Sequence, residues 1–188
     1  NVAVIPNSVS MPEYTPPSSE PVLLFLGSDY GANLEAADYM ARRIWPHVRE
    51  AMPEARLVIA GISKNLLDSG VHDTPGIEVP GFVESLDDLY ASCRVVVTPI
   101  LVGGGTRFKI IEAGAYGRPV VSTTVGMEGI DLTPGSEIIV RDDPREFAVA
   151  CVELLIDTAL SERIGLAARE KAAARYDRRA VVENIRQR

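Results

Sequence analysis

Residues 102–119 read VGGGTRFKIIEAGAYGRP and follow an apolar run, RVVVTPI, at residues 94–100. An apolar run of this length, rich in β-branched residues, predicts a buried strand. Gly103, Gly104 and Gly105 bring no side chain to a core and cost backbone entropy. Such glycines are typical of a loop whose backbone N–H groups approach a ligand closely, most often an anion. The alternative is a flexible surface turn.

A helix is expected directly after the glycine loop. Thr106 is a suitable N-cap residue, and the glycine and proline at positions 117 and 119 provide the signal that ends the helix. Three apolar residues recur at helical spacing and are expected to form its buried face: Phe108, Ile111 and Ala115. The segment therefore predicts a strand, a glycine loop and a helix in succession.

Two cations fall in the first turn of this predicted helix. Arg107 and Lys109 stand where the helix dipole is positive, which is unfavourable unless an anion binds there. Phosphate is the obvious candidate for that anion. Glu112 lies one turn further along, and it is either a solvated surface residue or an acceptor for the hydroxyl groups of a sugar.

Short apolar strands alternate with helices along the rest of the chain. The expected strands are 22–27, 56–61, 76–82, 94–100, 119–122 and 136–140; the other expected helices are 34–51, 64–69, 86–92, 147–155, 160–175 and 178–188, with a loop over 123–132. This alternation predicts an α/β fold, a Rossmann-like parallel sheet of about six strands flanked by helices. Glycines at positions 27, 61, 81 and 103–105 follow the strand ends, where ligands of such sheets bind.

Composition sets the outer bounds on function. The chain has 188 residues, of which 46% are hydrophobic and 24% charged, as in an ordinary globular domain. A net charge of −7 argues against a nucleic-acid scaffold but leaves room for a local nucleotide site. Cys93 and Cys151 lack metal-ligand spacing and are expected to be buried free thiols. The loop GSDYGA at residues 27–32 lacks the glycine spacing of a dinucleotide fingerprint, which excludes a nicotinamide site there.

The segment GGGTRFKIIEAGAYGRPVVST at residues 103–123 resembles the donor-binding segment of the GT-B-fold retaining glycosyltransferases of the group 1, or family 4, type. The resemblance runs from residue 4 to about residue 175, and this segment is its specific part. It implies the C-terminal, donor-binding half of a GT-B fold, which helps to move a sugar from a nucleotide-diphosphate sugar to an acceptor with retention. Two glutamates contact the donor in that family. Glu112 matches the one that holds the ribose, whereas Gly104 occupies the position of the other.

The resemblance also assigns roles to individual residues. Arg107 and Lys109, with the backbone N–H groups of residues 104–106, would neutralise the diphosphate, and with Glu112 they are the candidate catalytic residues. Gly27 and Ser28 would face the donor phosphates, in a loop that here carries Asp29 and no basic residue. Phe82 and Val83 would line the base pocket, mainly through backbone groups; the alternative for Phe82 is simple core packing. No metal or other cofactor is expected.

The resemblance further implies a division of the chain. Residues 1–21 would be an interdomain linker, 22–176 the nucleotide-sugar-binding domain, and 177–188 a helix that crosses back to an N-terminal, acceptor-binding domain absent here. This part alone would then be inactive. The whole protein would be cytoplasmic and would touch the inner membrane face only through the missing half. It would act in a process such as cell-surface polysaccharide biosynthesis. Two alternatives remain: a nucleotide-sugar 2-epimerase on the same fold, and a non-catalytic nucleotide-sugar-binding module, for which Gly104 is the one hint.

Overall fold

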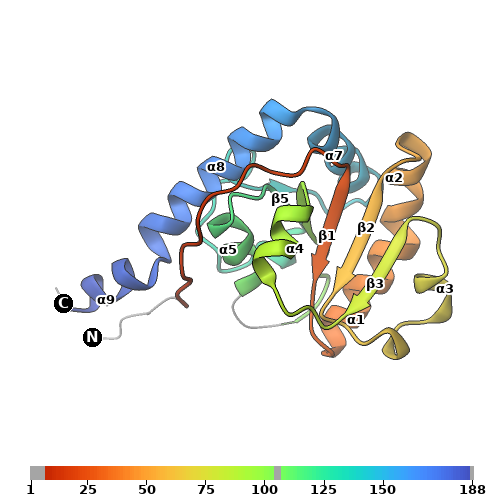
Figure 1. The fold of residues 1–188 in the computed structure, drawn as a ribbon, viewed down its shortest axis with the longest axis horizontal. Helices are drawn as coiled ribbons and strands as arrows, with labels where there is room; N and C mark the ends of the chain where they lie inside the picture. Colours follow the sequence, from red (N-terminus) through yellow and green to blue (C-terminus); the bar gives the residue numbers. More distant parts are fainter. Residues whose placement is uncertain (1–6, 104–106, 187–188) are drawn as a thin grey trace.

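One six-stranded sheet forms the centre of the protein (Figure 1), as seen in a computed structural model that describes residues 7–103 and 107–186. The strands are β1 (Val22–Leu26), β2 (Arg56–Ala60), β3 (Ile77–Gly81), β4 (Val95–Thr98), β5 (Val120–Ser122) and β6 (Ile139–Val140). Their order is β3-β2-β1-β4-β5-β6, and every neighbouring pair is parallel. The predicted Rossmann-like α/β fold is confirmed.

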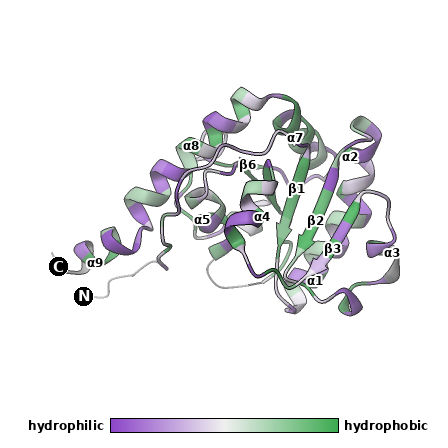
Figure 2. Ribbon diagram, viewed as in Figure 1, coloured by the Kyte–Doolittle hydropathy of each residue, from purple (hydrophilic) through white to green (hydrophobic). Residues whose placement is uncertain are grey.

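Helices cover both faces of this sheet. They are α1 (Gly31–Tyr39), the π-helical turn η1 (Met40–Ile44), α2 (Trp45–Ala51), the 3₁₀ turn η2 (Lys64–Leu66), α3 (Ser69–His72), α4 (Leu86–Ser92), α5 (Phe108–Ala115), α6 (Thr124–Met127), α7 (Pro144–Ile156), α8 (Thr158–Arg175) and α9 (Arg178–Arg186). Successive strand residues point to opposite faces. Leu23 and Phe25 pack with α1, η1, α2 and α7, whereas Val22 and Leu24 pack with α4 and α5. The strands are therefore hydrophobic on both sides, as Figure 2 shows for β1.

The helix predicted over 34–51 begins earlier and is not regular. It starts at Gly31, and residues 40–44 widen into a π turn before Pro46. A proline lacks an N–H donor and its ring crowds the carbonyl four residues earlier, so a widened turn accommodates it. The predicted apolar face of this helix is confirmed, because Met40, Ile44 and Val48 are fully buried.

Other short elements differ from the prediction for local reasons. The expected loop 123–132 contains α6, whose first turn is capped by Thr123 Oγ1, the acceptor of the Gly126 N–H at 2.9 Å. The helix expected over 64–69 is instead η2 followed by α3. The helices expected to begin at 147 and 160 begin at 144 and 158, where aspartates at 143 and 157 cap them.

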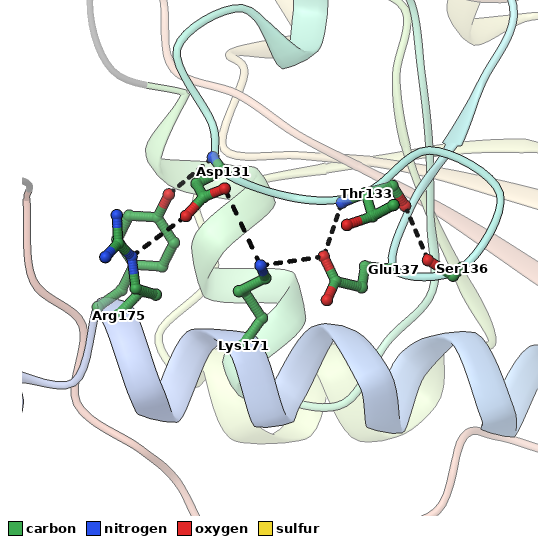
Figure 3. A network of polar contacts seen from close by, with 7 residues as sticks. Asp131, Thr133, Ser136, Glu137, Lys171 and Arg175 are labelled. Carbon is green, nitrogen blue, oxygen red and sulfur yellow. Dashed lines mark hydrogen bonds and ion pairs between the residues drawn. The ribbon is translucent and has the colours of Figure 1, made fainter.

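The strand expected over 136–140 is reduced to two residues by a turn that precedes it (Figure 3). Glu137 Oε2 accepts the backbone N–H of Thr133 at 2.6 Å, and Gly135 has a left-handed backbone with φ 85°. Lys171 on α8 lies 3.6 Å from the same glutamate oxygen and 3.9 Å from Asp131. The turn is thus held against α8 by charge, and only Ile139 and Val140 remain free to pair with β5.

Residues 7–21 run in extended form along the domain and are held there by arginines. Arg94 Nε donates to the Ser18 carbonyl at 2.7 Å, and Arg118 donates to the carbonyl and hydroxyl of Thr15 at 2.7 and 2.9 Å. Nearer the start of the chain, Val9 forms a parallel bridge with Asp177, just before α9. The start of the described chain and α9 therefore lie together, beyond the end of α8 (Figure 1).

The loops after β1 and β2 are pressed together through two glycines. Gly61 has φ 79°, and a Cβ there would lie 2.0 Å from the carbonyl oxygen of Gly27. Its N–H also donates to the Gly81 carbonyl at 2.7 Å. A side chain at position 61 would therefore have to displace the loop that follows β1.

We predict that Gly61→Ala destabilises the protein by about 3 kcal/mol or more, because a displaced backbone adds to the cost of a left-handed alanine. Gly129→Ala is the matched control: Gly129 has φ 78°, but a Cβ there would meet nothing within 4 Å. It should cost only the conformational term, about 1–2 kcal/mol. Urea unfolding of the two variants measures the difference, and equal losses would show that the contact with Gly27 is unimportant.

Candidate functional site

The order of the strands reverses between β1 and β4. These two strands are neighbours, but β1 leads into α1 on one face of the sheet and β4 leads toward α5 on the other. In an open parallel sheet this divergence opens a crevice at the carboxyl ends of the strands, which is the usual ligand position. Among the described residues, the loop after β1 and Gly103, which follows β4, lie at these strand ends.

Lys109 joins α5 to the start of α1. Its Nζ donates to Asn33 Oδ1 at 2.7 Å and lies 4.8 Å from the centroid of the Phe25 ring. Asn33 in turn donates through Nδ2 to the carbonyl and hydroxyl oxygens of Ser28, at 3.1 and 3.2 Å. Burial, with a smaller contribution from the charge of Arg107, lowers the pKa of Lys109 to about 8. A partly desolvated ammonium is thus held at the crevice by a neutral partner.

The first turn of α1 faces the same place. This nine-residue helix has no side-chain cap at Tyr30 and no acidic residue in its first turn. A Cβ on Gly103 would lie 3.4 Å from Ala32 Cβ, so the loop after β4 touches the start of α1. The Arg107 Nη2 donates to the Gly103 carbonyl at 2.7 Å, which brings the guanidinium to this loop. An uncapped helix N-terminus and two cations therefore converge.

Asp29 is turned away from this positive region by its own hydrogen bonds. Its two carboxylate oxygens accept the backbone N–H of Ser63 at 2.7 Å and the Ser63 hydroxyl at 2.6 Å. These bonds lower the pKa of Asp29. The carboxylate is therefore committed to the loop after β2 and stays ionised.

Glu112 lies on α5, one turn beyond Lys109, and is half-buried. Its Oε2 accepts the hydroxyl of Tyr90 at 3.0 Å. Burial raises the pKa of Glu112, and the hydrogen bond from Tyr90 opposes that rise. The carboxylate is thus held in a defined orientation rather than solvated at the surface.

Phe82 and Val83 follow the carboxyl end of β3. The Phe82 side chain is 85% exposed, so the alternative that it packs in the core is wrong. Val83 is half-buried and packs against the cluster that contains Tyr90. The Phe82 side chain is therefore open to solvent at the carboxyl edge of the sheet.

The structure brings most of the predicted site residues to one edge of the sheet. Gly27, Ser28, Gly103, Arg107, Lys109 and Glu112 flank the ends of β1 and β4, and Phe82 and Val83 follow β3. Gly104, Gly105 and Thr106 lie outside the described residues; the N-cap of α5, predicted at 106, is Arg107. Sequence reasoning missed Asn33 and Tyr90, because their partners are 76 and 22 residues away.

One predicted detail of α5 is wrong. Phe108 was expected on the buried face but is 38% exposed, whereas Ile110 is fully buried. The helix begins at Phe108 itself, with Arg107 as its N-cap residue, so Phe108 stands at the open end of the helix and is partly exposed. Ile111 and Ala115 are buried as expected.

Metal-ligand clusters and membrane-spanning helices are both absent from residues 7–103 and 107–186. Within these ranges no group of three or more His, Cys, Asp or Glu residues could hold a metal ion. In the same part of the chain, no helix is long and apolar enough to cross a membrane.

A separate groove of about 720 Å³ lies between α2 and α7. Val149 and Ile156 are among its lining residues, and none of the site residues above lines it.

Comparison with solved structures finds the same fold in other proteins. The Anabaena protein Alr3699/HepE, solved with UDP and glucose, has a TM-score of 0.78 and 16% identity, covering 98% of this chain and 55% of that one. A Staphylococcus aureus TarM mutant, solved with fondaparinux, α-GlcNAc-glycerol and UDP, has a TM-score of 0.78 and 17% identity, covering 100% of this chain and 38% of that one. Sucrose-phosphate synthase from Thermosynechococcus elongatus has a TM-score of 0.76 and 20% identity, covering 97% and 50%.

Comparison of sequences agrees with this. An uncharacterised 44.6 kDa protein in the cps region of Klebsiella pneumoniae is 24% identical over 172 residues, covering 87% of this chain and 44% of that protein. The chain thus spans about half the length of the relatives it matches. Residues 20–157 match the family model of the glycosyl transferases group 1, which is most of the chain and includes every candidate site residue. The chain belongs to the group 1 glycosyl transferases.

Proposed function

We propose that this chain is the donor-binding domain of a glycosyltransferase that moves a sugar from a nucleotide-diphosphate sugar to an acceptor, with retention. The observation that carries the proposal is the link from Lys109 to Asn33 across the crevice. It gathers a partly buried ammonium, the guanidinium of Arg107 and the uncapped start of α1 at the point where the sheet reverses. A buried ammonium beside a helix N-terminus is the kind of arrangement that binds a diphosphate.

The nucleoside would lie beside Glu112, one turn further along α5 than Lys109. Glu112 offers a carboxylate acceptor for ribose hydroxyl groups, and Phe82 and Val83 would contact the base. We choose UDP as the first nucleotide to test because the structural neighbours from Anabaena and Staphylococcus aureus were solved with UDP.

Transfer from such a donor requires stabilisation of a leaving diphosphate while the sugar becomes oxocarbenium-like. Preorganised positive charge supplies this without movement at the moment of reaction. Lys109 and Arg107 are the residues that would do so. Retention rests on the resemblance of residues 103–123 to the retaining enzymes, and acceptor binding would come from another domain. A role in making a cell-surface polysaccharide fits the description of the Klebsiella relative, which lies in a cps region.

Calorimetric titration with UDP, GDP and dTDP tests the proposal. We expect one nucleotide to bind selectively, and Glu112→Ala or the pair Arg107→Ala, Lys109→Ala to weaken its binding about ten- to a hundredfold, the value of one charge-assisted hydrogen bond. Arg163→Ala, an exposed arginine on α8, is the control and should leave the affinity unchanged. Failure of the folded, full-length protein to bind any nucleotide would overturn the proposal; binding without transfer would favour a non-catalytic module.

The affinity for UDP should also fall as the pH rises above about 8. The pKa of Lys109 is about 8 in the free protein, and a bound diphosphate favours its charged form and raises that pKa. Binding therefore takes up a proton above pH 8, and the affinity falls by up to about tenfold per pH unit there. The phosphate groups of the nucleotide do not titrate in this range, because their pKa is about 6. The uracil N3–H begins to ionise at the upper end of the range, and that contribution is the same for every variant of the protein.

Lys109→Arg is the matched variant for this pH dependence, since arginine keeps its charge throughout the range. Titrations at about pH 7, 8 and 9, which bracket the lysine pKa, should show a clearly steeper decline in affinity for the wild type than for Lys109→Arg. The same decline in both proteins would mean that another group is responsible.

A further inference from the structure

Two tyrosines connect α4 to α5 beside the candidate nucleoside site. The rings of Tyr90, on α4, and Tyr116, at the end of α5, stack with centroids 4.2 Å apart and planes inclined by 15°. Each hydroxyl then crosses to the other helix. Tyr90 donates to Glu112 Oε2 at 3.0 Å, and Tyr116 donates to Asp87 Oδ1 at 2.7 Å. The two side chains have the same packing but different acceptors.

The Tyr90 hydroxyl has a single acceptor and no contact with solvent. Tyr90 is fully buried, and burial together with Glu112 raises its pKa well above the ordinary value, so it acts as a donor at any relevant pH. The bond occupies one oxygen of Glu112. Among the described residues, no group donates to the other oxygen, Oε1. A donor on one side thus fixes the carboxylate while leaving the second oxygen for a ligand.

We infer that Tyr90 is a positioning residue for the nucleoside: its hydroxyl holds Glu112 so that the free carboxylate oxygen meets the ribose hydroxyls. The inference rests on the proposed function. It also explains why α4 matters to the site, since α4 begins just after Phe82 and Val83. Tyr90 therefore sets the distance between the segment expected to contact the base and the carboxylate expected to hold the ribose.

The test compares UDP with 2′-deoxy-UDP, which lacks one of the ribose hydroxyls that would donate a hydrogen bond to Glu112. Calorimetric Kd values for both nucleotides are measured in the full-length wild type, Tyr90→Phe, Tyr116→Phe and Glu112→Ala. The wild type should prefer UDP by roughly tenfold or more, the value of a hydrogen bond to a charged group. Glu112→Ala should abolish the preference, and Tyr90→Phe should reduce it to within about threefold.

Tyr116→Phe is the control that separates positioning from general stability. It removes a hydroxyl from the same stacked pair and the same contact between α4 and α5, but leaves Glu112 untouched. It should keep the wild-type preference even if its thermal midpoint falls as far as that of Tyr90→Phe.

The outcomes are distinct. A preference unchanged in Tyr90→Phe but lost in Glu112→Ala would overturn the role of Tyr90 and leave the proposed function standing. An equal loss of preference in both tyrosine variants would also overturn it, since the effect would then be structural. A wild type that binds none of UDP, GDP and dTDP would overturn the proposed function and this inference together.

Discussion

The site depends on the reversal of the strand order between β1 and β4. After β1 the chain continues into α1 on one face of the sheet, and after β4 it continues toward α5 on the other face. Because α1 and α5 diverge, no helix fills the space between their starts. Beside this point, Gly27 and Gly61 pack backbone against backbone, where a side chain at position 61 would not fit. The hydrogen bond from Lys109 to Asn33 joins α5 to the start of α1. The ammonium of Lys109 is therefore fixed where the two helices diverge.

The positive charge at this site comes from α5 and not from the loop after β1. The loop after β1 carries Asp29 instead of a basic residue, and Ser63 holds that carboxylate with two hydrogen bonds. The cations come from the far side, on α5, and Lys109 reaches over Phe25 to the start of α1. A lysine placed so is partly desolvated, which lowers its pKa and makes it sensitive to a bound anion. The acidic net charge of the chain is thus no obstacle to binding a diphosphate at this point.

The sequence predicted the layered fold well because local patterns determine it. Runs such as VLLFL at residues 22–26 are apolar at every position, which only a strand buried on both faces requires. Helix starts at 144 and 158 were missed although aspartates precede them, a signal that was present and unused. Phe108 was misplaced because spacing does not show that it stands at an open helix end. Asn33 and Tyr90 could not be found, since their roles arise from contacts between distant segments, and no local pattern records the order of strands.

The most direct test of the central claim is an NMR titration of the ¹⁵N-labelled protein with UDP, read residue by residue. If nucleotide binds where β1 and β4 diverge, the largest amide shifts should fall in the loop from Gly27 to Asn33, at Gly103 and in the first turn of α5. Residues of the groove between α2 and α7, such as Val149, should stay unchanged. Shifts centred on that groove, or none at saturating UDP in a folded protein, would contradict the claim.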